Sequence, residues 1–174
     1  MAERRGGAAR GETRTTEAET PAAGSTGPLA DFDLEQHIFY LFGQAYGRRN
    51  RQLADIFHEY GLTNPKYRVL AALTNRDGCP IGTLAKLTAV ERTTLSRALD
   101  QLVADKLVKR VPRAGDKRTI EVWMTAEGWR TLERVWPLIV AQNERAVAGL
   151  SDSEIETLKA ILRKMIDNLR DDDR

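Results

Sequence analysis

The segment between residues 80 and 124 constrains the fold of this chain more than any other part of it. It reads PIGTLAKLTAVERTTLSRALDQLVADKLVKRVPRAGDKRTIEVWM, in which two short helical patterns precede a basic hairpin and a return strand. Residues 81–87 carry large aliphatic side chains on one helical face, and a second stripe follows at Leu95, Leu99 and Leu102. We therefore predict two short helices that pack against each other as a helix-turn-helix.

The exposed face of the second predicted helix carries hydroxyl and guanidinium groups. Its members are Arg92, Thr93, Thr94, Ser96 and Arg97. Such side chains contact base edges and phosphates when a helix lies in the major groove of DNA. We expect Arg92, Thr93 and Thr94 to contact bases. Arg97, together with Lys86 on the first helix, is expected to contact phosphates.

A wing is predicted after the two helices. Strands are expected at 107–111 and 119–124, because apolar and polar residues alternate in the second of them, and residues 113–118 then form a hairpin tip. The basic residues of the tip that we expect to contact DNA are Arg113, Lys117 and Arg118. Arg118 is the first candidate for insertion into a minor groove, where A·T-rich stretches concentrate negative potential.

The acidic residue of the tip, Asp116, is expected to pair with an arginine and so to hold the tip in shape. In isolation, the Gly-Asp sequence could equally be a plain turn with solvated charges. Its place directly after a helix-turn-helix favours the wing.

Three longer helices are predicted outside this segment. Residues 33–36 resemble a helix-capping start, and apolar residues then recur at helical spacing to Gly61, which gives a helix of about 26 residues. A second helix should run over 125–149, with Pro137 bending it by removal of a backbone donor. A capping-box sequence at 151–154 opens the third. Their apolar stripes are too long for one small winged domain to cover, so we predict a homodimer.

These elements divide the chain into three kinds of segment. Residues 1–28 contain no large aliphatic or aromatic residue after Met1 and are expected to form a disordered tail. Residues 29–62 and 125–174 should supply dimerisation helices, and residues 63–124 the winged helix-turn-helix. The predicted fold class is mainly α with a small β wing, flanked by long N- and C-terminal dimerisation helices.

The distribution of charge favours a nucleic-acid partner. The formal net charge is only +2, but residues 76–118 carry ten Lys or Arg against five Asp or Glu, hence +5. Residues 125–174 carry eight against ten, hence −2. Positive charge therefore gathers on the elements predicted to read DNA.

Sequence patterns of an enzyme are missing. The chain has no glycine-rich phosphate loop, nucleophile elbow or His-Glu-x-x-His zinc motif, and its two histidines, His37 and His58, lie 21 residues apart. The acidic run 171–173 is interpreted as solvated charge. We expect no catalytic activity, no cofactor and no metal. With no apolar run long enough to span a bilayer and no signal-peptide pattern, we expect a cytoplasmic protein without a membrane partner.

Four stretches, in the same order, resemble the MarR (multiple antibiotic resistance regulator) family of bacterial winged-helix transcription factors. They are GLTNPKYRVLAAL, TLAKLTAVERTTLSRALDQLVADKLVKR, the wing GDKRTIEVWMTAEGWRTL with its Asp-x-Arg, and GLSDSEIETLKAILRKM. The resemblance spans about residues 31–169, with Lys66 where many relatives carry glutamine and no counterpart for the first 28 residues. It implies a homodimer that reads a pseudo-palindromic operator in double-stranded DNA. It also implies release from DNA by a small molecule, often a phenolic or an aromatic carboxylate.

The joint between the first long helix and the winged domain is the expected place for a small-molecule site, since it sets the spacing of the two recognition helices. Its candidates are His37, Tyr40, Tyr67 and Arg68. An aromatic floor with a cationic group suits a planar carboxylate. The simpler interpretation makes the two tyrosines core or interface residues and His37 an ordinary polar helix residue.

We hypothesise a repressor that a small aromatic acid or related catabolite releases from its operator. The alternative is a winged-helix protein that binds DNA constitutively, or a protein-interaction module, without a small-molecule effector. Ligand-dependent release of DNA discriminates between the two. The single cysteine, Cys79, is a candidate redox switch, with Arg76 placed to lower its pKa, and the alternative is an inert thiol.

Overall fold

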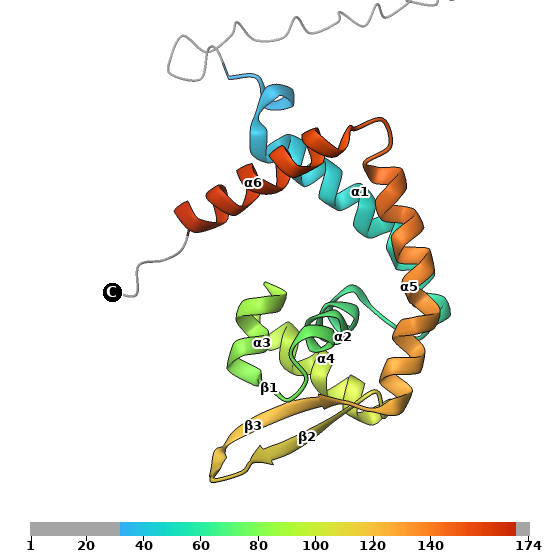
Figure 1. Ribbon diagram of the computed structural model, residues 1–174, viewed down its shortest axis with the longest axis vertical. Helices are drawn as coiled ribbons and strands as arrows, with labels where there is room; N and C mark the ends of the chain where they lie inside the picture. Colours follow the sequence, from blue (N-terminus) through green and yellow to red (C-terminus); the bar gives the residue numbers. More distant parts are fainter. Residues whose placement is uncertain (1–31, 170–174) are drawn as a thin grey trace, which may run out of the picture.

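A computed structural model describes residues 32–169 of the chain (Figure 1). The predicted disordered tail, residues 1–28, lies outside the described residues. The described part is mainly helical with one three-stranded antiparallel sheet, as the sequence predicts. Its elements in order are a 3-10 turn Leu34–Gln36, α1 Ile38–Glu59, α2 Asn64–Asn75, β1 Cys79–Pro80, α3 Ile81–Thr88, α4 Arg92–Ala104, β2 Val108–Arg113, β3 Asp116–Met124, α5 Ala126–Ala146 and α6 Asp152–Asn168.

The winged domain is built around a core of fully buried aliphatic side chains. They are Val69, Leu70 and Leu73 of α2, Leu84 of α3, Leu95, Leu99 and Leu102 of α4, and Val122 of β3. Full burial of each such side chain stabilises the fold by about 1.5 to 3 kcal/mol relative to exposure. The helix-turn-helix α3–α4 is thus confirmed. Because α4 commits one face to this core, its polar face is directed outward.

The wing is longer than predicted. The sequence predicts strands at 107–111 and 119–124, whereas β2 continues to Arg113 and β3 begins at Asp116. The tip is reduced to a two-residue turn in which Gly115 has a φ of 82°, a conformation that favours glycine. On a projecting hairpin both faces meet solvent, so the apolar alternation ends before the hydrogen-bonded ladder does. The two-residue strand β1, not predicted, pairs with β3 and joins the wing to the start of α3.

The first long helix begins later than predicted. Asp33 does accept a hydrogen bond from the backbone N–H of Glu35, at 2.9 Å, but the cap closes only the 3-10 turn. His37 then takes an extended conformation and α1 starts at Ile38, which shortens it to 22 residues. Gly61 follows the end of α1 with a φ of 65°, in agreement with its predicted place after the helix.

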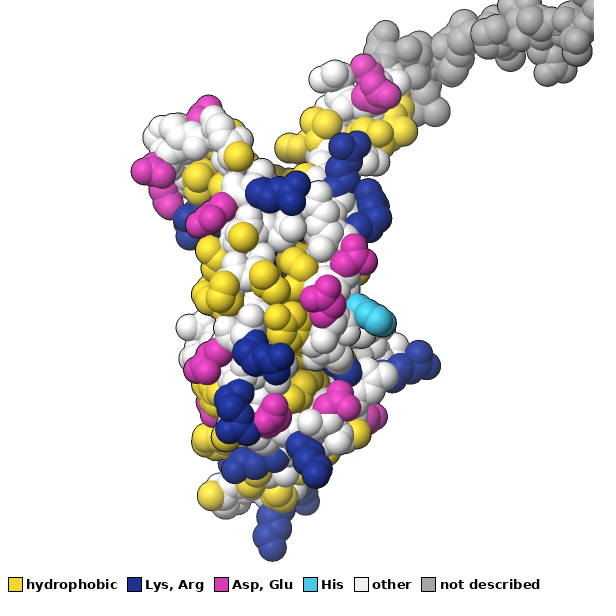
Figure 2. Space-filling model, turned by 90° about the vertical axis from the view of Figure 1, so that its right-hand side faces the viewer, with side chains coloured by type: hydrophobic (Ala, Val, Ile, Leu, Met, Phe, Trp, Pro, Cys, Tyr) yellow, Lys and Arg dark blue, Asp and Glu magenta, His cyan; other side chains and the backbone are white. Residues whose placement is uncertain are grey.

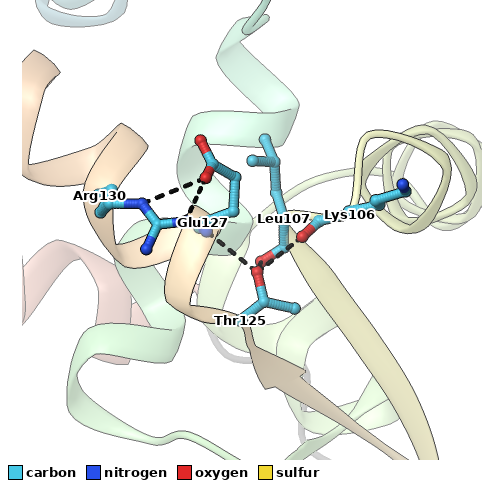
Figure 3. A network of polar contacts seen from close by, with 6 residues as sticks. Lys106, Leu107, Thr125, Glu127 and Arg130 are labelled. Atoms are coloured by element: carbon cyan, nitrogen blue, oxygen red, sulfur yellow. Dashed lines mark hydrogen bonds and ion pairs between the residues drawn. The ribbon is translucent and has the colours of Figure 1, made fainter.

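A compact junction holds the base of the wing against α5 (Figure 3). The hydroxyl of Thr125 donates to the backbone carbonyl of Lys106 at 2.7 Å, and its oxygen accepts from the backbone N–H of Gly128 at 3.0 Å. A Cβ added at Gly128 would lie 2.1 Å from the carbonyl oxygen of Leu107, so this close approach requires glycine. The direction in which α5 leaves the wing is fixed by these contacts.

Helices α5 and α6 form an arm that leads away from the wing and crosses α1 at the far end of the molecule (Figure 1). Pro137 lies inside α5, which continues to Ala146. Of the predicted apolar stripe of α5, Leu132, Val135 and Ile139 are buried, whereas Trp136 is half exposed. The predicted capping box of α6 is confirmed, since Ser151 and Glu154 each accept from the other's backbone N–H.

The apolar faces of α1 and α6 are largely uncovered. No residue of α6 is buried, and its large aliphatic side chains are between 43% and 69% exposed at Leu158, Ile161, Ile166 and Leu169. At the start of α1, Ile38, Phe39 and Leu41 are each more than half exposed. Both helices therefore present apolar surface that contacts within one copy do not cover.

Candidate nucleic-acid interface

A groove of about 800 Å³ lies between the two helices of the helix-turn-helix and strand β3. Its apolar floor includes Ile81, Leu95 and Leu99. Four basic side chains surround this floor, namely Lys86, Arg92, Arg110 and Arg118. The hydroxyl residues Ser96 and Thr119 also line the groove. A concave, cationic surface of this kind suits a polyanion.

The residues predicted to contact DNA form the proposed reading surface of the molecule. All nine are exposed and belong to α3, α4 or the wing. Lys86, Arg92, Ser96 and Arg118 line the groove itself. The other five extend the same elements beyond it: Thr93, Thr94, Arg97, Arg113 and Lys117. In Figure 2, Lys and Arg side chains gather toward the end of the molecule that carries the wing, below a band of hydrophobic side chains.

The N-terminus of α4 is closed by a carboxylate that the sequence analysis did not single out. Glu91, the N-cap residue, accepts from the backbone N–H of Thr93 at 2.9 Å and of Thr94 at 3.1 Å. The hydroxyl of Thr93 also donates to it. These hydrogen bonds, that of the Thr93 hydroxyl first, lower the pKa of Glu91 to about 2. An acidic residue directly before the helical pattern was the available signal.

Within residues 32–169, Asp116 holds the wing tip without the arginine pairing predicted for it. Its carboxylate accepts from the hydroxyl of Thr119 at 2.6 Å and from the backbone N–H of Arg118 at 3.1 Å. Those two bonds, with a smaller effect of the charge of Arg113, lower the pKa of Asp116. The ion pair of the wing joins Arg113 to Glu121 across the strands, at 2.7 Å. The prediction of a pairing arginine is wrong, because the tight turn brings backbone and hydroxyl donors closer than a guanidinium.

A second ion pair joins the wing to the recognition helix. Arg110 of β2 lies 2.8 Å from the carboxylate of Asp100 on α4. The sequence analysis did not predict this pair, because the two residues come from different elements and each looks like ordinary surface charge. The pair links β2 to α4 beside the groove, which Arg110 lines.

Lys66 carries a nearly buried charge between the ends of two helices. Its side chain is 9% exposed, and its ammonium donates to Asp105, the C-cap of α4, at 2.8 Å. The same ammonium donates to the carbonyl of Gly61, just past the end of α1, at 3.0 Å. A cation at two helix C-termini also interacts favourably with their dipoles. The end of α1 is thereby linked to the end of the recognition helix.

Two of the four residues predicted to bind a small molecule lie side by side. Tyr67 and Arg68, on α2, line a cavity of about 410 Å³. Arg68 donates to the carbonyl of Thr88 at 2.8 Å and to the hydroxyl of Tyr46 on α1. Tyr67 stacks on Phe57, with 4.9 Å between ring centroids, and burial raises the pKa of its hydroxyl. Tyr46, which the sequence analysis missed, is the α1 residue that meets Arg68.

A neighbouring cavity of about 550 Å³ shares Tyr67 and has Trp129 and Trp136 of α5 in its wall. His37 and Tyr40 line neither cavity. His37 lies at the start of α1, with ring centroids of Phe32 and Phe39 5.6 and 5.9 Å away. Within one copy, the structure therefore does not bring His37 and Tyr40 together with Tyr67 and Arg68.

Cys79 is buried at the start of β1, with 3% of its surface exposed. Burial raises the pKa of its thiol, and the charge of Arg76 only partly offsets that effect. Arg76 thus lowers this pKa as predicted, but the larger effect of burial makes the net shift upward. Among residues 32–169, no cluster of His, Cys, Asp and Glu side chains is arranged to hold a metal ion. No helix in the described range combines the length and apolar character needed to span a membrane.

Comparison with known proteins relates the chain to regulators of transcription. A family model described as MarR family matches residues 60–119. The HTH-type transcriptional repressor NicR of Pseudomonas putida is 28% identical over 146 residues, 83% of this chain and 92% of NicR.

Solved structures give the same relationship. A MarR-family transcriptional regulator from Silicibacter pomeroyi matches with a TM-score of 0.74 and 39% identity over 84% of this chain and 99% of that one. BpsR of Bordetella bronchiseptica, whose structure concerns the regulation of its DNA binding by 6-hydroxynicotinic acid, matches with a TM-score of 0.67 and 26% identity. That match covers 74% of this chain and 97% of BpsR.

Proposed function

Because this chain belongs to the MarR family of transcription regulators, we propose that it is a homodimeric repressor that binds a pseudo-palindromic operator and leaves it when a small aromatic acid binds. The observation that carries the proposal is the basic groove between α3, α4 and β3. Chromosomal DNA is its proposed partner, so we assign its activity to the cytoplasm. Membership of a family of transcription regulators also argues against a catalytic role.

The proposed contacts follow from the position of each side chain around the groove. Arg92, Thr93 and Thr94, at the start of α4, are assigned to base edges in the major groove. Phosphate contacts are assigned to Lys86 and Arg97, and a further contact from α4 to Ser96. Arg113 and Lys117 are assigned to further contacts from the wing. Arg118 is assigned to the minor groove of DNA, because it lies on β3 at the side of the basic groove of the protein and its side chain is exposed.

Dimerisation is supported by the uncovered apolar faces of α1 and α6. Contiguous exposed apolar surface of this extent is typical of an interface. We assign residues 29–62 and 125–174 to the dimer and residues 63–124 to DNA reading. A two-fold axis through the α1 and α6 region then presents two recognition helices to successive half-sites, about one helical turn apart.

The effector is proposed to bind in the cavity between α2 and the end of α3, beside the contact of Arg68 with Tyr46 of α1. The cavity offers the aromatic ring of Tyr67 and the guanidinium of Arg68, which can donate two hydrogen bonds to a planar carboxylate. That BpsR is regulated by 6-hydroxynicotinic acid, an aromatic acid, supports this class of ligand. His37 and Tyr40 are retained as proposals for the part of the site that a second copy contributes.

Fluorescence anisotropy tests the proposal directly. Wild type and Arg118→Ala are titrated against duplex DNA from the region upstream of their own gene, at fixed salt and with competitor DNA. A panel of aromatic acids, including 6-hydroxynicotinic acid, is then added to the complex. We expect specific binding, weaker binding by Arg118→Ala with a salt slope reduced by about one, and release by one acid.

A third variant separates sensing from reading. Arg68→Gln lies outside the reading surface, so it should bind the same duplex and lose its response to the acid. Specific binding that no acid alters contradicts the aromatic-acid effector and favours the constitutive alternative. If no specific binding is found on the native upstream region or on random-sequence duplexes, the proposed function itself is wrong.

A further inference from the structure

Glu91 places a negative charge at the start of α4, beside the basic groove. It is exposed and adjoins Arg92, which lines the basic groove. A carboxylate in such a position repels the phosphates that the groove attracts. Such a carboxylate favours binding to DNA where a hydrogen-bond donor of a base meets it.

The Glu91 carboxylate already accepts hydrogen bonds from its own helix, and one of its oxygens can accept another. Oε2 accepts from the backbone N–H groups of Thr93 and Thr94 and from the Thr93 hydroxyl. Among the donors of residues 32–169, Oε1 accepts only the N–H of Thr93, at 2.9 Å. An ionised carboxylate has about four acceptor positions, so Oε1 can take a further donor. The contacts with α4 hold it in place for that donor.

The same hydrogen bonds change what the neighbouring threonines can offer to DNA. A hydroxyl has one proton and two lone pairs. The Thr93 hydroxyl gives its proton to Glu91, and the Thr94 hydroxyl lies 3.5 Å from the same carboxylate oxygen. Thr93 therefore presents lone pairs outward. The start of the recognition helix is an acceptor surface flanked by the guanidinium groups of Arg92 and Arg97.

In the major groove only two base atoms donate hydrogen bonds, the N4 amino group of cytosine and the N6 amino group of adenine. Adenine also presents its N7 acceptor beside N6, which repels a carboxylate, whereas cytosine presents the donor alone. We propose that Glu91 determines operator specificity by accepting a hydrogen bond from the N4 amino group of one cytosine in each half-site. This inference rests on the proposed DNA-binding function and names a base that the function must recognise.

Three variants distinguish base reading from helix capping. Glu91→Ser keeps an N-cap acceptor and removes the carboxylate, so it is the matched control for capping. Glu91→Gln replaces the acceptor-only group by an amide, which pairs with N6 and N7 of adenine. Arg97→Ala serves as a variant that weakens a proposed phosphate contact for every sequence alike. Each variant and the wild type select binders from a random-sequence duplex library.

When the selected sequences are aligned, we expect the base preference to change with the residue at position 91 at one position in each half-site. The preference at every other position should stay the same. Wild type should select cytosine there, Glu91→Gln should shift the choice toward adenine, and Glu91→Ser should lose the preference. Replacing that cytosine by 2-pyrimidinone, which lacks the amino group, should weaken wild type about 5- to 150-fold. The same replacement should leave the affinity of Glu91→Ser nearly unchanged.

Identical selected sequences for all four proteins, with affinity lowered equally on every site, overturn the inference and leave Glu91 as a cap only. Selection of an A·T or T·A base pair at that position by wild type overturns it as well. Failure of wild type to select any sequence refutes the proposed function instead. Thermal unfolding of each variant, measured alongside, identifies any loss of binding that comes from loss of fold.

Discussion

The arginines of the wing differ in whether a carboxylate of the protein forms an ion pair with them. Arg110 and Arg113 are each paired with a carboxylate of the protein, Asp100 and Glu121. Within residues 32–169, no carboxylate forms an ion pair with the side chain of Arg118. The paired arginines therefore maintain the shape of the wing, while Arg118 can give its full charge to DNA. Replacing Arg118 should lower affinity without changing the thermal stability of the protein.

Cys79 illustrates how burial determines the chemistry of one side chain. Because burial raises the pKa of the Cys79 thiol, the thiol stays protonated at pH 7 and at pH values up to the ordinary pKa of cysteine. Only the thiolate is nucleophilic, so the buried thiol should react slowly. We predict that Ellman's reagent modifies the native protein at pH 8 much more slowly than the urea-unfolded chain. Equal rates in the two states contradict this prediction. A DNA affinity that peroxide abolishes in wild type but not in Cys79→Ser would establish the redox switch instead.

At the scale of the elements, the ends of helices are joined by side-chain contacts. Lys66, whose side chain is 9% exposed, joins the end of α1 to the end of α4. Lys66→Met removes the hydrogen bonds to Asp105 and Gly61 and is expected to lower the free energy of unfolding by about 1 to 3 kcal/mol. Lys66→Gln can still donate, so its loss should be smaller. Urea unfolding measures both. The control is Lys159→Met, in an exposed pair on α6, which should change stability little.

An equal loss for Lys66→Met and the exposed control contradicts a structural role for the buried ammonium. Because the link joins the end of α1 to the end of α4, Lys66→Met should also loosen the required spacing between operator half-sites. Affinity for duplexes with one base pair added between the half-sites reports that effect.

The junction of the wing with α5 depends on the absence of a side chain at one position. Gly128→Ala places a Cβ against the carbonyl oxygen of Leu107 and should destabilise the fold by roughly 1 to 3 kcal/mol or more. Gly82→Ala in α3 is the control, since a Cβ there meets nothing within 4 Å. Alanine's better helix propensity should make that control neutral or slightly stabilising. A comparable loss for both variants, measured by urea unfolding, would contradict the close-contact argument.

Amphipathic elements of ordinary length could be predicted from the sequence, and contacts between distant residues could not. The stripes of α3, α4 and α6 follow helical periodicity, and the capping box at Ser151 is a local signal. Strand β1 has two residues, and its partner Val122 lies 43 positions further on, so no local pattern marks it. The meeting of Tyr46 with Arg68 likewise depends on how α1 packs on α2. Glu91 was missed because a capping carboxylate looks like surface charge.

On the scale of the whole molecule, the proposed dimer interface at the uncovered apolar faces of α1 and α6 is what joins two reading surfaces. Ile161→Asp places a charge on the uncovered face of α6, where the native side chain is 49% exposed in one copy. The monomer should stay folded, while the dimer and operator binding are lost. Lys164→Glu, outside the groove between α1 and α6, is the charge-change control. Sedimentation equilibrium and anisotropy measure the two effects, and a dimeric Ile161→Asp variant contradicts the proposed interface.

The uncovered face of α1 and α6 is also separate from the residues proposed to contact DNA, and in the proposed dimer this separation has a genetic consequence. A subunit with a damaged reading surface, such as Arg118→Ala, keeps every apolar side chain of that face. When such a subunit is produced in the same cell as wild type, it should form heterodimers with wild-type subunits. Each heterodimer then has only one intact reading surface. Lesions in the recognition helix or wing should therefore be dominant over the wild-type allele, whereas lesions in α6 should be recessive.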